Sequence, residues 1–127
     1  MLYKKHIAEK TTQALVLGCL IFTLADLQAQ TKIQSGSWSV NQSVPGYSLD
    51  NNIGERSVTL DILFAEPFAK KPKVILTITQ VDSDKDFNSR YRPEPISISR
   101  DGFTLKVSTW ADSKIFSLSG SWLAYVE

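Results

Sequence analysis

The sequence predicts an all-β protein, a six-stranded antiparallel β-sandwich. Apolar and polar residues alternate with a period of two in several short runs, the pattern of a strand with one face buried. Clusters of Gly, Pro, Asn and Asp separate these runs. After residue 30 no segment sustains the 3.6-residue period of a helix. Strands at this spacing in one small chain are typical of a sandwich.

The first clear strand is predicted over Ser57–Phe64, where Val58, Leu60, Ile62 and Phe64 share one face. The next covers Val74–Val81. Its β-branched and apolar residues follow one another with few interruptions, so we predict a central strand.

Three further strands follow toward the C-terminus. Pro95–Ser99 alternates cleanly, and Asp101-Gly102 then predicts a turn. The strand Phe103–Thr109 directs Phe103, Leu105 and Val107 to one face. In the last strand the predicted inward residues are Phe116, Leu118, Trp122 and Ala124.

Residues 1–29 predict a secretory signal peptide, and residues 30–127 the domain. Lysines near the start precede an apolar run, Ala14–Ala25, and small and polar residues follow it. This run is short for a bilayer-spanning helix, which needs about 20 apolar residues. An uncleaved anchor, or lipidation of Cys19, is the alternative. With cleavage near Ala29 we expect a secreted or extracellular protein, or a periplasmic one in a bacterium, with no membrane attachment.

Removal of residues 1–29 would leave 98 of the 127 residues, with equal numbers of basic and acidic side chains and no His, Cys or Met. The lack of a basic excess argues against nucleic-acid binding. A Ser-His-Asp or Cys-His nucleophile and a histidine zinc site are excluded. We expect a binding protein without a metal or other cofactor, and not an enzyme. A glycosidase would need only two carboxylates, and the candidates lie in the loop Asp82–Asp86.

Trp110 is the first candidate binding residue. It ends the strand that begins at Phe103, on the same face as Thr104, Lys106 and Ser108. A large aromatic side chain on a polar face, just before a turn, suits stacking on a ligand. Alternatively, it covers the rim of the sandwich or a subunit interface.

The acidic segment Asp82–Asn88 and Arg90 are the next candidates. The segment resembles the start of a calcium loop, but Phe87 and Pro93 stand where that loop needs Gly and Glu. A solvated hairpin loop is the alternative. Arg90 presents a planar set of donors suited to hydroxyls or a carboxylate. Alternatively, it forms a surface ion pair with the acidic loop. Asn41-Gln-Ser43 matches an N-glycosylation sequon.

Residues 56 to 125 resemble the H-type lectin domain of snail agglutinins and of the discoidin C-terminal region. The segments that carry the resemblance, in chain order, are Phe64–Phe68, Lys71–Asp82, Asn88–Arg90, Gly102-Phe103, Ser108–Trp110, Lys114–Ser117 and Ser121–Ala124. Gln34–Trp38 looks like the opening strand of the family.

The resemblance implies a homotrimer, or stacked trimers forming a hexamer, that binds galactose or N-acetylgalactosamine between subunits. One subunit would contribute Arg90 and polar groups of an N-terminal loop, for which Asp50, Asn51 and Asn52 are the candidates. Its neighbour would contribute Trp110 and a nearby aromatic residue, here Phe116.

Two positions depart from the pattern of the family. Ala111 stands where the snail proteins often have His, and Phe116 replaces a Tyr hydroxyl. Each change removes a polar contact to the sugar. A structural or adhesive trimer that has lost or altered its sugar binding is therefore the alternative function.

Overall fold

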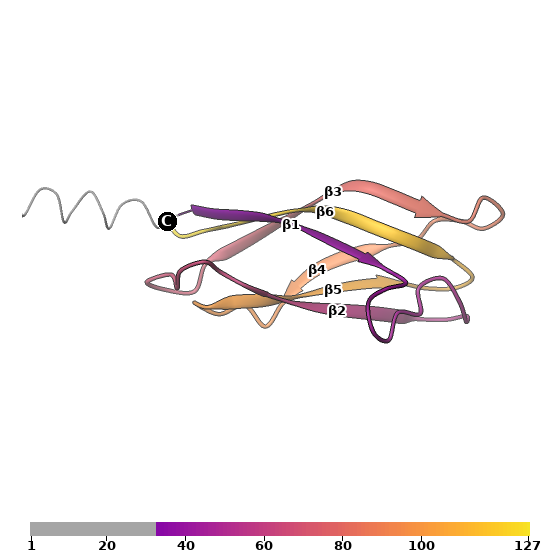
Figure 1. Ribbon diagram of the computed structural model, residues 1–127, viewed down its shortest axis with the longest axis horizontal. Coiled ribbons are helices and arrows are strands. Elements are labelled where there is room, and N and C mark those ends of the chain that lie inside the picture. Colours follow the sequence, from indigo (N-terminus) through magenta and orange to yellow (C-terminus); the bar gives the residue numbers. More distant parts are fainter. Residues whose placement is uncertain (1–32) are drawn as a thin grey trace, which may run out of the picture. The chain divides into compact units, whose positions relative to one another are not determined.

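The computed structural model describes residues 33–127, which form six strands in two three-stranded sheets (Figure 1). The first sheet has the order β1-β6-β3: Ile33–Asn41, Ile115–Tyr125 and Lys73–Ser83. The second sheet has the order β2-β5-β4: Arg56–Leu63, Gly102–Thr109 and Arg92–Ile96. All paired neighbours are antiparallel, so the predicted all-β sandwich is confirmed. The signal-peptide prediction falls on residues outside those described.

The core lies between the two sheets, and both contribute alternate residues to it. Val58 of β2, Leu105 and Val107 of β5, and Leu118 and Trp122 of β6 are buried. Burial of each large apolar side chain stabilises the folded state by about 1.5–3 kcal/mol. The predicted inward faces of β2 and β5 are therefore confirmed.

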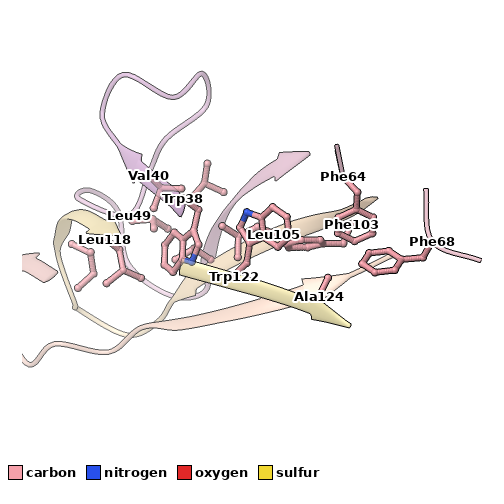
Figure 2. Packing of buried hydrophobic residues seen from close by; sticks show 13 residues of the cluster. Trp38, Val40, Leu49, Phe64, Phe68, Phe103, Leu105, Leu118, Trp122 and Ala124 are labelled. Carbon is pink, nitrogen blue, oxygen red and sulfur yellow. The ribbon is translucent and has the colours of Figure 1, made fainter. Parts of the chain in front are cut away.

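Aromatic rings close one end of this core (Figure 2). Phe64 packs edge-on against Phe68 with ring centroids 5.0 Å apart. It also lies 5.7 Å from Trp122, which in turn packs against Phe103 at 5.8 Å. All four of these aromatic residues are buried, whereas Trp110 is exposed and lies outside the core.

The prediction of a central strand over Val74–Val81 is wrong. β3 is an edge of its sheet and β6 is central, and Ile75 and Ile78 of β3 are exposed. The β-branched composition correctly indicated a strand, but strand order depends on pairing with β6, about 40 residues away. A register shift between Ile78 and Gln80 interrupts this pairing, as β-bulges on edge strands do.

The strand predicted over Pro95–Ser99 lies earlier in the chain, over Arg92–Ile96. It ends before Ser97, whose φ of 50° is incompatible with an extended strand. Both Pro93 and Pro95 lie in this strand, which is an edge of its sheet. Proline lacks an N–H donor and is tolerated there because one side of an edge strand needs no partner.

Candidate functional site

Three loops that carry the candidate residues lie at the same end of the sandwich (Figure 1). They connect β1 to β2, β3 to β4, and β5 to β6. Each antiparallel pair joins an odd-numbered strand to an even-numbered one, and β1, β3 and β5 all end at this end of the sandwich (Figure 1). The topology therefore gathers Asp50–Asn52, Arg90 and Trp110, which the sequence separates by up to 60 residues.

Trp110 follows β5 directly and opens the turn to β6. The residue is 39% exposed, which agrees with the outward direction predicted for it, whereas Ser108, predicted on the same face, is buried. The guanidinium carbon of Arg92 lies 5.7 Å from the ring centroid, a cation–π arrangement. The indole Nε1–H has no hydrogen-bond partner within residues 33–127. Trp110 thus offers an apolar ring and a free donor to a ligand.

Arg90 is bonded to the turn that follows Trp110. Its Nη1 group donates to Asp112 Oδ1 at 2.8 Å and to Ser113 Oγ at 3.1 Å. Arg90 does form an ion pair, as the alternative predicted, but its partner is Asp112 and not a residue of the acidic loop. Among residues 33–127, the Nε and Nη2 groups of Arg90 have no acceptor. These donors remain available to a ligand.

The contact with Arg90 lowers the pKa of the Asp112 carboxyl. The hydrogen bond from Arg90 is the largest of the effects that hold the pKa of the Asp112 carboxyl below its ordinary value of 3.8. Asp112 is therefore ionised at neutral pH and fixes the direction of the Arg90 guanidinium. Because the carboxylate side chain is 55% exposed, this pair orients Arg90 more than it stabilises the fold.

The loop between β1 and β2 brings Asp50, Asn51 and Asn52 to the same end. Asp50 Oδ2 accepts a hydrogen bond from Gln42 Nε2 at 2.6 Å. The side chains of Asn51 and Asn52 are exposed, and Asn52 has the left-handed φ of 62°. Tyr47 anchors the loop by donating its hydroxyl to Ile115 O at 2.6 Å. Burial raises the pKa of this Tyr47 hydroxyl, so it stays a donor.

Phe116 does not take the inward position predicted for it. Ile115 is fully buried in its place, whereas Phe116 is half-buried. A register shift between Asp82 and Ser83 of β3 occurs opposite this part of β6 and breaks the alternation there. Leu118, Trp122 and Ala124 are buried as predicted. Phe116 therefore remains a candidate for contact outside the core.

Sequence reasoning missed Arg56 and Ser113. Arg56 is buried and bonds to carbonyl groups of both the β1–β2 loop and the turn after Trp110. Ser113 is fully buried and accepts from Arg90 through Oγ and from Arg56 through its carbonyl. One signal was present: Arg56 has the same parity as Val58 and Leu60 in its strand, which directs a charged side chain inward.

The acidic segment after β3 forms a local turn, in which Asp84 Oδ1 accepts from the backbone N–H of Asp86 at 2.9 Å. Within the described part of the chain, no group of three or more His, Cys, Asp or Glu side chains is placed to hold a metal ion. Nor does any helix among those residues have the length and apolarity to cross a membrane.

Comparison with known proteins matches the sequence to a family and finds a similar fold among solved structures. A model of the H-type lectin domain matches residues 59–125. A discoidin-1 polypeptide of Dictyostelium discoideum is 32% identical over 78 residues, which are 61% of this chain and 31% of that protein. A Fuscovulum blasticum protein described as ATP synthase subunits region ORF 7 is 35% identical over 71 residues, 56% of this chain and 62% of the other. The chain thus spans less than two thirds of either relative.

Discoidin II of Dictyostelium discoideum has a similar fold. Its crystal structure superposes with a TM-score of 0.66 at 21% identity, over 75% of this chain and 37% of discoidin II. At this identity the similarity concerns the fold alone. The matched range of the lectin model includes Arg90, Trp110 and Phe116, whereas Asp50, Asn51, Asn52 and Arg56 precede it.

Proposed function

This chain belongs to the H-type lectin domain family, and from that membership and the geometry of the loops we propose that it binds carbohydrate. The observation that carries the proposal is the convergence of Trp110, Arg90 and the Asp50–Asn52 loop at one end of the sandwich. A sugar presents an apolar ring face and a rim of hydroxyls. An exposed indole ring and unpaired guanidinium donors match these two features.

The ligands we propose are galactose and N-acetylgalactosamine. Trp110 would stack on the apolar face of the pyranose ring. The Nε and Nη2 donors of Arg90 would bind ring hydroxyls, and the amides of Asn51 and Asn52 would supply further hydrogen bonds. The match of residues 59–125 to the lectin domain supports this assignment.

We further propose that the site is completed between subunits of a homotrimer, and that stacked trimers form the larger assembly. Sites of this kind are individually weak, and linking three of them raises the effective affinity by avidity. The pattern of residues 1–29 supports a secreted or extracellular location. Catalysis plays no part in this proposal.

Binding to an immobilised glycan panel tests the proposed function. We expect the wild-type protein to bind glycans that end in galactose or N-acetylgalactosamine, and Trp110→Ala to lose this binding. Leu63→Ser is the matched control, because Leu63 is exposed but lies at the opposite end of β2 from the loops. Binding that Trp110→Ala leaves unchanged would contradict the assignment.

The second candidate function is a structural or adhesive module with altered sugar binding. One observation favours it: Trp110 and Arg90 already have partners within the chain, namely Arg92 and Asp112. Ala111 and Phe116 also lack the polar groups of the family pattern. If this function is correct, the wild-type protein assembles but binds no glycan of the panel, and Trp110→Ala changes its mass in light scattering.

A further inference from the structure

Arg56 joins the two halves of the candidate site through its guanidinium group. The Nε group donates to Gly54 O at 2.9 Å, and Nη1 donates to Asn51 O and Asn52 O at 2.6 and 3.1 Å. These acceptors lie in the β1–β2 loop. Across the site, Nη1 also donates to Ser113 O and Nη2 to Ala111 O, both at 3.0 Å. One planar group therefore holds the Asn51–Asn52 segment against the turn that follows Trp110.

The environment of Arg56 is unusual for a charged residue. It is only 8% exposed, and its partners are carbonyl oxygens rather than a carboxylate, since no ion pair of Arg56 occurs within residues 33–127. Burial of a charge is costly, and apolar residues of similar volume often stabilise a fold as well or better. Five hydrogen bonds to two separate loops instead indicate control of loop geometry.

The backbone around these acceptors supports this interpretation. Asn52 and Ala111 have left-handed φ values of 62° and 54°; asparagine enters this region more readily than most residues, whereas alanine adopts it reluctantly. Both residues offer their carbonyls to Arg56. The guanidinium therefore holds the carbonyl of a residue, Ala111, whose backbone conformation is strained. The conformation of the two loops sets where the Asn51 and Asn52 amides and the Trp110 ring face the solvent.

The same connection reaches Arg90 through Ser113. The Ser113 carbonyl accepts from Arg56, while its hydroxyl accepts from the Nη1 group of Arg90 at 3.1 Å and donates to Asn88 O. Ser113 of the β5–β6 loop thus bonds directly to the β3–β4 loop, and through Arg56 it is connected to the β1–β2 loop. Arg56 is therefore bonded, directly or through Ser113, to the segments that carry Asn51, Asn52, Trp110 and Arg90.

We propose that Arg56 is the positioning residue of the carbohydrate site, which it preorganises without touching the ligand. The proposal rests on the proposed function for its effect on affinity, but its structural part is independent of any ligand. Lysine cannot replace arginine here, because a single ammonium group cannot reach five carbonyls in two loops in the geometry of the planar guanidinium.

The test compares Arg56→Lys with wild type in the full chain, by amide hydrogen exchange and by binding to N-acetylgalactosamine-agarose. The reporter is the Gly54 amide, which bonds to Ala111 O at 3.0 Å and so bridges the two loops. We expect its exchange to accelerate about tenfold or more, while the amides of β5 change less than about twofold. The affinity for the sugar should fall by a similar factor, because the loops must then become ordered on binding.

Arg100→Lys is the matched control. Arg100 also donates through Nε to a backbone carbonyl, Phe68 O at 2.7 Å, but at the other end of the sandwich. It should leave both the Gly54 exchange rate and sugar binding unchanged. A second variant, Arg56→Ala, should regain slow Gly54 exchange when methylguanidinium is added, a rescue that a general loss of stability would not show.

The outcomes separate the two proposals. Unchanged Gly54 exchange in Arg56→Lys, or acceleration that is equal in β5, overturns the positioning role. If the exchange result is as expected but wild-type protein does not bind the sugar matrix, Arg56 still positions the loops, and the proposed function fails. If exchange accelerates and affinity for the sugar is unaltered, the loop geometry has no bearing on binding, and the positioning role is overturned.

Discussion

Two arginines, Arg56 at the start of β2 and Arg90 just before β4, have different roles, although the sequence makes them look alike. Arg90 is partly exposed and keeps free donors, whereas Arg56 is buried and its donors are directed to backbone carbonyls. Parity within a strand could have revealed the inward direction of Arg56. The partner of Arg90 could not be predicted, because Asp112 comes near it only through the pairing of β4 with β5.

The ion pair between Arg90 and Asp112 predicts a titration. The pKa of Asp112 is lowered in the folded protein. The contribution of its carboxylate to the stability of the folded state is therefore present at neutral pH, and it is lost as the pH falls through the folded pKa, below 3.8. Carbon-detected NMR of the Asp112 carboxyl should give a midpoint below 3.8 in wild type. In Arg90→Gln the midpoint should rise. Equal midpoints in the two proteins would show that Arg90 does not hold the carboxylate.

At the scale of the element, the strands were easier to predict than their order. The period-two patterns found β2 and β5 within one residue of their observed ends, and the inward residues predicted for the last strand all lie in β6. The order of the strands in each sheet could not be predicted from the sequence patterns. Whether a strand lies at the edge or in the centre depends on its pairing with segments that are distant in the sequence. This is why β3 was assigned to the centre, and why the loss of alternation at Phe116, opposite a register shift, was missed.

The central position of β6 can be tested through its close packing against β1 and β3. A Cβ added at Gly120 would overlap the carbonyl of Thr77 on β3 and the indole of Trp38 on β1. We expect Gly120→Ala to reduce the free energy of unfolding by about 1–3 kcal/mol or more, because backbone must shift to accept the methyl group. Urea unfolding measures this change.

Ser37→Ala is the control for Gly120→Ala, because Ser37 is exposed on β1 at the register position opposite Ser121. Its effect should stay within about 0.5 kcal/mol, as for most surface substitutions. Unfolding midpoints that coincide for Gly120→Ala and wild type would mean that β3 and β6 are less closely paired than described.

At the scale of the whole molecule, more of the fold than of the site can be predicted from the sequence. The sandwich follows from alternation and turns, and the convergence of three loops follows from antiparallel connectivity. The internal bonding of the site does not, since it depends on contacts between side chains and backbone carbonyls, such as those of Arg56 and Ser113. Assembly depends on contacts between chains, so the proposed trimer is a prediction about how the surfaces of separate chains pack together.

Light scattering of the purified protein checks the proposed assembly. We expect a mass three times that of one chain, and a loss of binding to a multivalent glycan surface when the trimer is dissociated by dilution, because avidity then disappears. A mass of one chain at all concentrations, with unchanged glycan binding, would contradict sites between subunits.

The central claim is that Trp110 contacts a sugar, and the three tryptophans of the chain allow a direct measurement. Trp38 donates its indole N–H to Ser121 O and is buried, Trp122 is buried as well, and Trp110 is exposed. During titration of the ¹⁵N-labelled protein with N-acetylgalactosamine, the indole resonance of Trp110 should shift and saturate, while those of Trp38 and Trp122 remain in place. A titration in which Trp110 does not move, while the protein binds the sugar, would contradict the account.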